Sequence, residues 1–205
     1  MQPTATVLPL DLTDTLDADS SVVYVLDRTL RILYCNPAWD VFARANNGAL
    51  TLSSLVVGKP VTRFISGPMQ GYYTNAFNDV FRTGKVWQHR YECSSPLLFR
   101  TFSLNAMPVV NATLQVVSHF LDVVHPHGAD RVAMVPSSAQ YRTGKGILAM
   151  CSGCRRTRRT NEPDRWDWVP SYAANMPGGV SHSLCPVCIL HYFPSQRRRI
   201  PNPDQ

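Results

Sequence analysis

The sequence lacks the motifs on which several large enzyme classes depend. It contains no glycine-rich phosphate loop, no Walker lysine and no Gly-x-Ser-x-Gly nucleophile elbow. Its six histidines are scattered along the chain, and 205 residues are too few for a kinase or another large catalytic unit. We therefore expect a protein that is not an enzyme.

Long hydrophobic runs and a secretion signal are also missing. The apolar run at residues 114–124 falls short of the ~20 residues that a transmembrane helix needs, and polar positions interrupt it. The N-terminus has neither the basic start nor the apolar core of a signal peptide. These features predict a cytoplasmic protein that does not enter a membrane, in a reducing compartment where clustered cysteines bind metal rather than form disulfides.

Charged residues are few, at 17% of the chain, and their balance is uneven. Residues 1–124 hold nine Lys/Arg and nine Asp/Glu, whereas residues 125–205 hold eleven and five, which accounts for the net charge of +6. Most of the excess lies in two groups: Arg155, Arg156, Arg158 and Arg159, and Arg197, Arg198 and Arg199. Such arginines can bind nucleic acid, or they can offset the net charge of about −2 that four thiolates give to a zinc site.

Two CxxC motifs are the strongest chemical signal in the chain. Cys151 and Cys154 form the first, Cys185 and Cys188 form the second, and thirty residues separate them. Each motif offers two soft thiolates to one side of a metal, so together they predict a tetrahedral Zn²⁺ site of the structural kind. His182 is close enough in sequence to be an alternative ligand or to hydrogen-bond to a thiolate.

The other two cysteines are not part of this pattern. Cys35 and Cys93 lie far from the CxxC motifs, in apparent strands. A free cysteine packs like a small apolar residue, so we expect both to be buried side chains without a metal.

Strand and helix patterns fill residues 21–124. Two strands are predicted at 22–26 and 31–35, and Asn36 and Pro37 are suited to begin a helix. The buried face of that helix is expected to be Val41, Phe42 and Ala45. A longer helix ending near Gly84 has one apolar stripe, made of Met69, Tyr73, Phe77, Val80 and Phe81. Three further strands are predicted at 86–93, 98–110 and 114–124.

The remaining segments have simpler patterns. In residues 1–20, a polar tail leads to Leu8, Leu12 and Leu16 at helical spacing, which predicts a short amphipathic helix that could cover a domain edge or join a dimer. Residues 125–145 contain Pro and Gly with no sustained period and are expected to be a linker. Residues 146–194 form the four-cysteine module, beginning with a strand at 147–150, and residues 195–205 are a basic tail.

The order of elements in residues 21–124 resembles a PAS domain. The resemblance is carried by Val25-Leu26-Asp27, by Ile32 to Ala38 with its Asn-Pro-Ala helix start, by Phe42, and by Leu121 to Val124. It implies an α+β fold with a five-stranded antiparallel sheet, helices on one face and a small pocket. The candidate pocket residues are Tyr73, Phe77, Phe81, Phe102 and His119.

What this pocket holds stays open. The resemblance implies an unidentified small-molecule ligand, but residues 69–84 contain neither the histidine of haem-binding oxygen sensors nor the cysteine of flavin photosensors. Haem bound through His119, and flavin without a photoactive cysteine, are compatible with the sequence. The pocket could equally be filled by bulky side chains of the chain itself: Tyr72, Tyr73, Phe77, Phe81, Phe102 and Met107.

The C-terminal segment is similar to a module found after PAS domains in bacterial signalling proteins. The shared features are Met150-Cys151, Cys154-Arg155-Arg156, a Trp-rich stretch at 166–170, and Ser181-His182 leading to Cys188. A zinc-ribbon-like module of this size has too small a core to fold without its metal. Trp166 and Trp168 alternate, so their indoles are expected to pack on one side, over the metal site.

Three functions are consistent with this sequence. The preferred one is a PAS-type sensor with a structural zinc module that signals through a protein partner or a homodimer. A zinc–thiolate redox sensor would instead lose its metal and form disulfides when an oxidant attacks the cysteines. A nucleic-acid-binding regulator would use the arginines and bind with a steep salt dependence. Thiol–disulfide catalysis by one CxxC would need a βαβ context that this sequence does not have.

Overall fold

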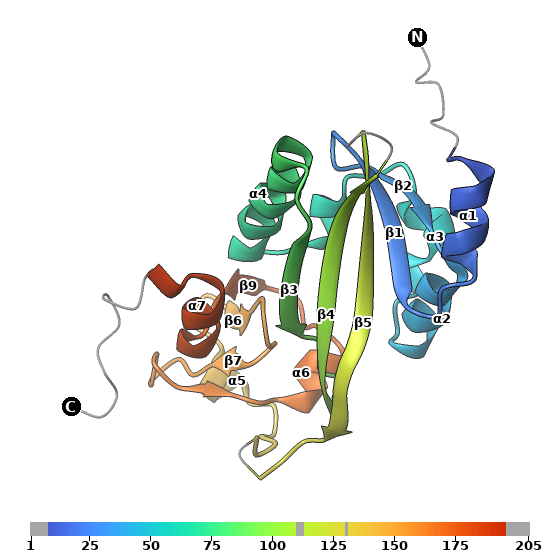
Figure 1. Cartoon of the computed structure of the whole chain (residues 1–205). Helices are drawn as coiled ribbons and strands as arrows, with labels where there is room; N and C mark the ends of the chain where they lie inside the picture. The colour runs from blue at the N-terminus through green and yellow to red at the C-terminus, as the bar shows by residue number, and fades with distance from the viewer. Residues whose placement is uncertain (1–7, 110–112, 130, 196–205) are drawn as a thin grey trace. The chain divides into compact units, whose positions relative to one another are not determined.

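The computed structural model describes residues 8–109, 113–129 and 131–195, and its contacts divide the chain into two compact units (Figure 1). The first unit comprises Met1–Ile65, Tyr73–Arg90 and Phe102–Asp122, and the second comprises Ser66–Tyr72, Tyr91–Thr101 and Val123–Gln205. The unit with the cysteines therefore includes two segments from within the sequence that resembles a PAS domain. None of the described helices is both long and apolar enough to cross a membrane.

Among the described residues, the larger sheet has five antiparallel strands in the order β2-β1-β5-β4-β3. The strands are β1 (Val22–Asp27), β2 (Ile32–Cys35), β3 (Trp87–Glu92), β4 (Leu98–Val109) and β5 (Leu114–Pro126). Helix α1 (Leu10–Asp17) precedes them, and five helical segments connect β2 to β3: α2 (Pro37–Ala45), η1 (Ala49–Thr51), α3 (Ser53–Val56), η2 (Val61–Phe64) and α4 (Pro68–Thr83). This confirms the α+β fold, the five predicted strands and the long helix.

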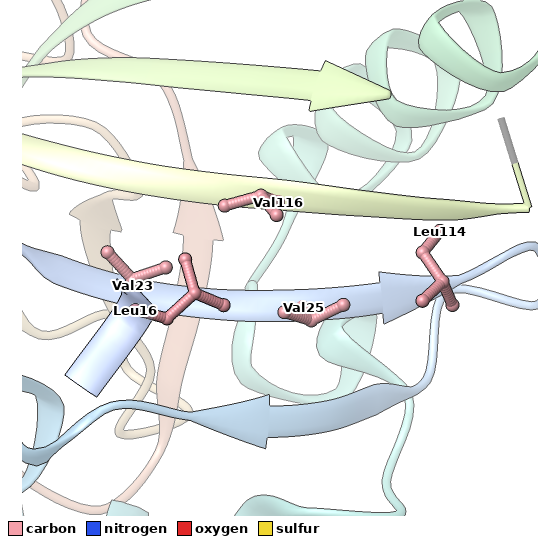
Figure 2. Close-up of a cluster of buried hydrophobic side chains, with 5 residues drawn as sticks. All are labelled: Leu16, Val23, Val25, Leu114 and Val116. Carbon is pink, nitrogen blue, oxygen red and sulfur yellow. The ribbon is translucent and has the colours of Figure 1, made fainter. Parts of the chain in front are cut away.

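Helix α1 covers one face of this sheet. Neighbouring residues on a strand point to opposite faces, so alternate residues of β1 and β5 share a side. They form one buried cluster with α1 (Figure 2): Leu16, Val23, Val25, Leu114 and Val116. Leu8 and Leu12 are partly buried against the same cluster. The predicted amphipathic helix therefore exists, and it packs on the sheet of its own unit.

The opposite face of the sheet is covered by α2 and α4. Tyr24 of β1 contacts Trp39 of α2 at a ring distance of 5.5 Å. His119 of β5 stacks on Tyr24 at 5.4 Å. The buried Gln115 side chain donates a hydrogen bond of 3.2 Å to the Phe77 carbonyl of α4. The interior of the first unit therefore lies between this face and the helices.

Helix α2 begins as predicted but buries a different side. Asn36 caps it by accepting a 3.1 Å hydrogen bond from the Trp39 N–H, and Pro37 takes the first helical position. Val41 is 65% exposed and Ala45 is exposed, so the prediction that they are buried is wrong. Trp39 determines the orientation instead, because its large ring packs inward and its indole N–H donates a 2.7 Å bond to the Thr51 carbonyl.

The second unit has its own small sheet, with strand order β8-β7-β6-β9. Its elements are α5 (Ser138–Tyr141), β6 (Leu148–Cys151), β7 (Thr157–Arg158), β8 (Trp166–Asp167), α6 (Pro170–Ala174), β9 (Val180–Ser183) and α7 (Pro186–Tyr192). One buried cluster contains Tyr141, Leu148, Met150 and Val169. Residues 125–145 thus contribute the helix α5 and the buried Tyr141 to this unit.

Candidate metal centre

A parallel strand pair brings the two CxxC motifs to the same edge of the small sheet. Strands β6 and β9 are parallel, with Cys151 in register with Ser183. Cys151 is the last residue of β6, and Cys185 lies two residues beyond the end of β9. Since parallel strands end on the same side of a sheet, both motifs leave it next to each other.

The first CxxC motif forms a tight turn between β6 and β7. The Arg155 N–H donates a 3.0 Å bond to the Cys151 carbonyl, and Arg155 itself has a left-handed φ of 61°. A Cβ atom on Gly153 would lie 2.9 Å from the Cys188 sulfur and 3.0 Å from the Tyr192 ring. Glycine is favoured at this position for steric reasons, because the first contact is closer than Cβ atoms come in proteins and the second is tighter than most.

The second CxxC motif begins helix α7. Cys185 directly precedes the helix and Pro186 takes its first position, where the missing N–H of proline has no cost. The Ile189 N–H donates a 2.9 Å bond to the Cys185 carbonyl, which closes the first turn around Cys188. A strand turn and a helix start thus supply two sulfurs each.

The structure brings together the four cysteines that the sequence predicted as ligands. Their Sγ atoms all lie within 4.8 Å of one another, and all four residues are buried. The Sγ atoms of Cys154 and Cys185 are 3.6 Å apart. Zn–S bonds of about 2.3 Å in a tetrahedron would place the sulfurs about 3.8 Å from each other. The group therefore fits Zn²⁺ without any change in the fold.

The thiols of this group differ in acidity. Thiol hydrogen bonds from Cys154, Cys185 and Cys188 lower the pKa of Cys151. The backbone N–H of Cys185 also donates to the Cys151 sulfur, at 3.3 Å. Hydrogen bonds with Cys151 and Cys185 raise the pKa of Cys154 and Cys188. Because four thiolates this close repel each other, full ionisation of the group requires a cation among them.

His182 lies outside the group of ligand atoms, which among the described residues consists of the four cysteines. In β9 it is in register with Met150, one residue out of phase with Cys151. Its side chain therefore leaves the sheet on the face opposite to that of Cys151. On that face its Cβ is close to Gly67, where an added Cβ would be only 2.8 Å away. Closeness in sequence favoured His182 as a ligand, but strand alternation turns it away.

A buried ion pair, which sequence reasoning missed, stands beside the cysteines. Arg131 donates two hydrogen bonds to the Glu92 carboxylate, at 2.5 and 2.9 Å. Its guanidinium lies over the rings of Phe99 at 5.4 Å and Trp168 at 4.9 Å. The ring of Trp168 is also 4.8 Å from that of His127. No local pattern could have paired residues that are 39 positions apart, and the contacts of Trp168 are those of a packed core residue.

Some arginines that follow Cys154 are occupied by local contacts. Arg159 bonds to Asp167 at 2.6 Å and to Glu162 at 2.8 Å, and Arg155 donates to the Ala173 carbonyl at 3.1 Å. Burial would raise the pKa of Asp167, but hydrogen bonds from Arg159 and Tyr141 outweigh it and lower the pKa. Arg159 is therefore engaged by carboxylates of its own unit, whereas Arg155 stays exposed.

The arginines of the predicted basic tail lie outside the described residues: Arg197, Arg198 and Arg199.

The candidate PAS-pocket residues all lie in the first unit. Phe77, Phe81 and Phe102 are buried. Tyr73 contacts the Phe77 ring at 5.9 Å, and both rings contact Trp87, at 5.7 and 5.6 Å. At least this part of the interior is therefore occupied by side chains.

His119 belongs to the candidate pocket, whereas Met107 and Tyr72, which could also have filled it, lie elsewhere. His119 is on the helix-covered face, and burial lowers its pKa to about 4. Met107 is half exposed, and Tyr72 belongs to the second unit, where it contacts Tyr192 at 5.3 Å. Met107 and Tyr72 therefore do not fill the interior of the first unit.

Cys35 and Cys93 are half-buried and lie outside the group of four. Burial raises the pKa of Cys35 to about 12 and also raises the pKa of Cys93. Both are expected to remain neutral thiols at pH 7.

No family model and no curated protein match the chain. Several solved structures of PAS domains do. The PAS domain of the quorum-sensing receptor RpfR of Cronobacter turicensis shares 17% identity over 51% of this chain and 96% of its own, with a TM-score of 0.38. That of Bordetella pertussis BvgS shares 14% over 55% and 85%, with a TM-score of 0.44. That of nitrogen regulation protein NR(II) of Vibrio parahaemolyticus shares 14% over 56% and 100%, with a TM-score of 0.36. At these values the matches carry no conclusion about ligand, partner or activity.

Proposed function

We propose that this chain is a non-enzymatic signalling protein whose second unit is held together by one structural Zn²⁺. The observation that carries the metal site is the buried group of four Sγ atoms within 4.8 Å of one another. Thiolates are soft ligands that favour zinc over hard cations such as Mg²⁺ or Ca²⁺. Four protein ligands leave the ion no open position at which a substrate could bind.

The ion would stabilise the second unit by joining two of its elements, the turn after β6 and the start of α7. Cys151 and Cys154 belong to the turn after β6, whereas Cys185 and Cys188 belong to the start of α7. The parallel pair of β6 with β9 spans only four residues, the strands β7 and β8 have two residues each, and the buried cluster is small. Metal binding would therefore supply part of the folding free energy of this unit.

The first unit is proposed to be the sensory part. Its α+β fold with buried aromatic side chains supports a PAS-type domain that responds to a signal, which could be an unidentified small molecule in its interior. The response would pass, in the cytoplasm, to a protein partner or within a homodimer.

Single cysteine replacements test the metal site. Cys151→Ser and Cys188→Ser should each lose zinc and make the second unit sensitive to protease, while the first unit stays resistant. Cys35→Ser is the matched control, because Cys35 lies outside the group, and it should retain both zinc and resistance. Unchanged zinc content and unchanged digestion in the first two variants would contradict the proposal.

A second experiment tests the mode of signalling. Sedimentation velocity over a range of concentrations detects a homodimer, and titration with labelled DNA and RNA oligonucleotides detects nucleic-acid binding. The proposal expects no nucleic-acid binding at physiological salt. Binding that weakens steeply with salt would favour the nucleic-acid regulator instead.

A further inference from the structure

The four sulfurs are not equally accessible. Cys151 and Cys185 are each 1% exposed, whereas Cys154 is 5% and Cys188 is 8% exposed. A cavity of about 280 Å³ explains the difference, because its walls include Cys154 and Cys188 but neither of the other two cysteines. One cysteine from each CxxC motif therefore faces a space that solvent can enter.

An ion pair and a further arginine both line this cavity. The ion pair is that of Arg131 with Glu92, and the guanidinium of Arg131 packs on the rings of Phe99 and Trp168. Arg156 also lines the cavity, and among the described residues no carboxylate pairs with it. The space is thus small, preformed and provided with a cationic hydrogen-bond donor beside the sulfurs.

We propose that this cavity makes Cys154 and Cys188 the site at which hydrogen peroxide oxidises the metal centre. The inference rests on the proposed zinc site. Bound zinc would hold all four cysteines as nucleophilic thiolates, so exposure would decide which sulfur is oxidised first. Cys151 is a poorer target, since it does not line the cavity and its sulfur already accepts the N–H of Cys185.

The reaction has two balanced steps. A thiolate sulfur, from Cys154 or Cys188, attacks one oxygen of the peroxide. The S–O bond forms, the O–O bond breaks, and hydroxide leaves, so the sulfur is oxidised to a sulfenic acid by two electrons and the peroxide is reduced. A second thiolate of the group then attacks the sulfenic sulfur. The S–S bond forms, the S–O bond breaks and a second hydroxide leaves.

The geometry suits both steps. Arg156 can donate a hydrogen bond to the leaving hydroxide, which carries the negative charge. All four sulfurs are within 4.8 Å of one another, so a resolving thiolate is always adjacent. A disulfide between two of the four cysteines would remove half of the ligands of a bound Zn²⁺ and would therefore favour its release.

The test begins with zinc-loaded full-length protein, whose metal content is measured first. Hydrogen peroxide is added below one equivalent in the presence of dimedone, which traps sulfenic acids, and zinc release is followed with a chromogenic chelator. Peptide mass mapping should find the first dimedone adducts on Cys154 or Cys188. First adducts on Cys151 or Cys185 would overturn the proposal.

One substitution at the cavity and a matched control away from it add an independent readout. Val187 lines the cavity and is exposed, so Val187→Phe should obstruct the space without disturbing the fold. Zinc release by peroxide should become slower by a factor of roughly three or more, because oxidation follows access. Val135→Phe makes the same change at an exposed valine of the same unit that does not line the cavity, and it should release zinc at the wild-type rate. Equal rates in both variants would overturn the proposal.

These results distinguish the inference from the function beneath it. A protein purified without zinc contradicts the proposed metal site itself. A protein that holds zinc but is oxidised first at the inner cysteines contradicts the cavity as the point of attack and leaves the structural site standing.

Discussion

At the scale of single residues, the metal centre depends on a glycine as well as on its cysteines. A methyl group on Gly153 would lie 2.9 Å from the Cys188 sulfur. Gly153→Ala should therefore displace that sulfur and lower the zinc affinity, by roughly the 10–100-fold seen when residues that support a metal ligand are lost. Competition with a zinc chelator measures this affinity.

The same unit offers a matched control for this substitution. Gly144 has open space where a Cβ would be added, so Gly144→Ala should leave zinc affinity unchanged. If both variants bound zinc like the wild type, the steric account of the first CxxC turn would be wrong.

A second prediction at this scale concerns His119 and pH. Burial lowers its pKa to about 4, from the usual 6.5. Between these values the unfolded chain binds a proton that the folded chain does not. The contribution of neutral His119 to the free energy of unfolding is complete above pH 6.5 and is lost as the pH falls toward 4. The loss is roughly 1–2 kcal/mol by pH 5.

Urea unfolding of the wild type and of His119→Gln at pH 7 and pH 5 checks this prediction. The free energy of unfolding should fall less in the variant than in the wild type. Acid also weakens thiolate–zinc bonds, but this contribution is common to both proteins and cancels in the difference. Equal falls in both proteins would contradict the burial of His119.

At the scale of elements, helix α1 shows how one apolar stripe attaches a short helix to a sheet. Leu16 is 6% exposed in the cluster with Val23 and Val25, whereas Leu10 of the same helix is 80% exposed. Leu16→Ala should lower the free energy of unfolding by about 2–4 kcal/mol, through lost burial and a residual cavity. Leu10→Ala should change it by roughly 0.5 kcal/mol or less. Urea unfolding followed by circular dichroism measures both, and similar effects would contradict the observed packing.

Sequence patterns predicted elements well where the signal was local. The five strands and α4 were found because their apolar residues alternate or recur along a single segment. The cap of α2 was found because Asn36 bonds to a residue three positions away. The buried face of α2 was wrong, because Trp39 was left out of the stripe and its bond to Thr51 could not be foreseen.

The cysteine site was predictable as a set of ligands but not as a structure. CxxC spacing alone indicated four sulfurs around one ion. The parallel pairing of β6 with β9, the approach of Gly153 to Cys188 and the ion pair of Arg131 with Glu92 all join residues far apart in the chain. Single-sequence patterns do not record such contacts, so the cavity beside the sulfurs could be found in the structure alone.

At the scale of the whole molecule, the two units interleave in sequence. The second unit takes in Ser66–Tyr72 and Tyr91–Thr101, which precede its four clustered cysteines by at least fifty residues. Within it, Tyr72 contacts Tyr192 at the end of α7, and Glu92 binds Arg131. The metal-binding unit is therefore assembled from three separate segments of the chain.

The central claim is that Cys151, Cys154, Cys185 and Cys188 hold one zinc ion. Elemental analysis of untagged protein tests it most directly, together with two titrations of free thiols. The first is made on the native protein and the second after a chelator and denaturant have been added. The account predicts one zinc per chain, with only Cys35 and Cys93 of the six cysteines available to the reagent before chelation and all six afterwards. No bound metal, with the four thiols free or paired as disulfides in the native protein, would contradict it.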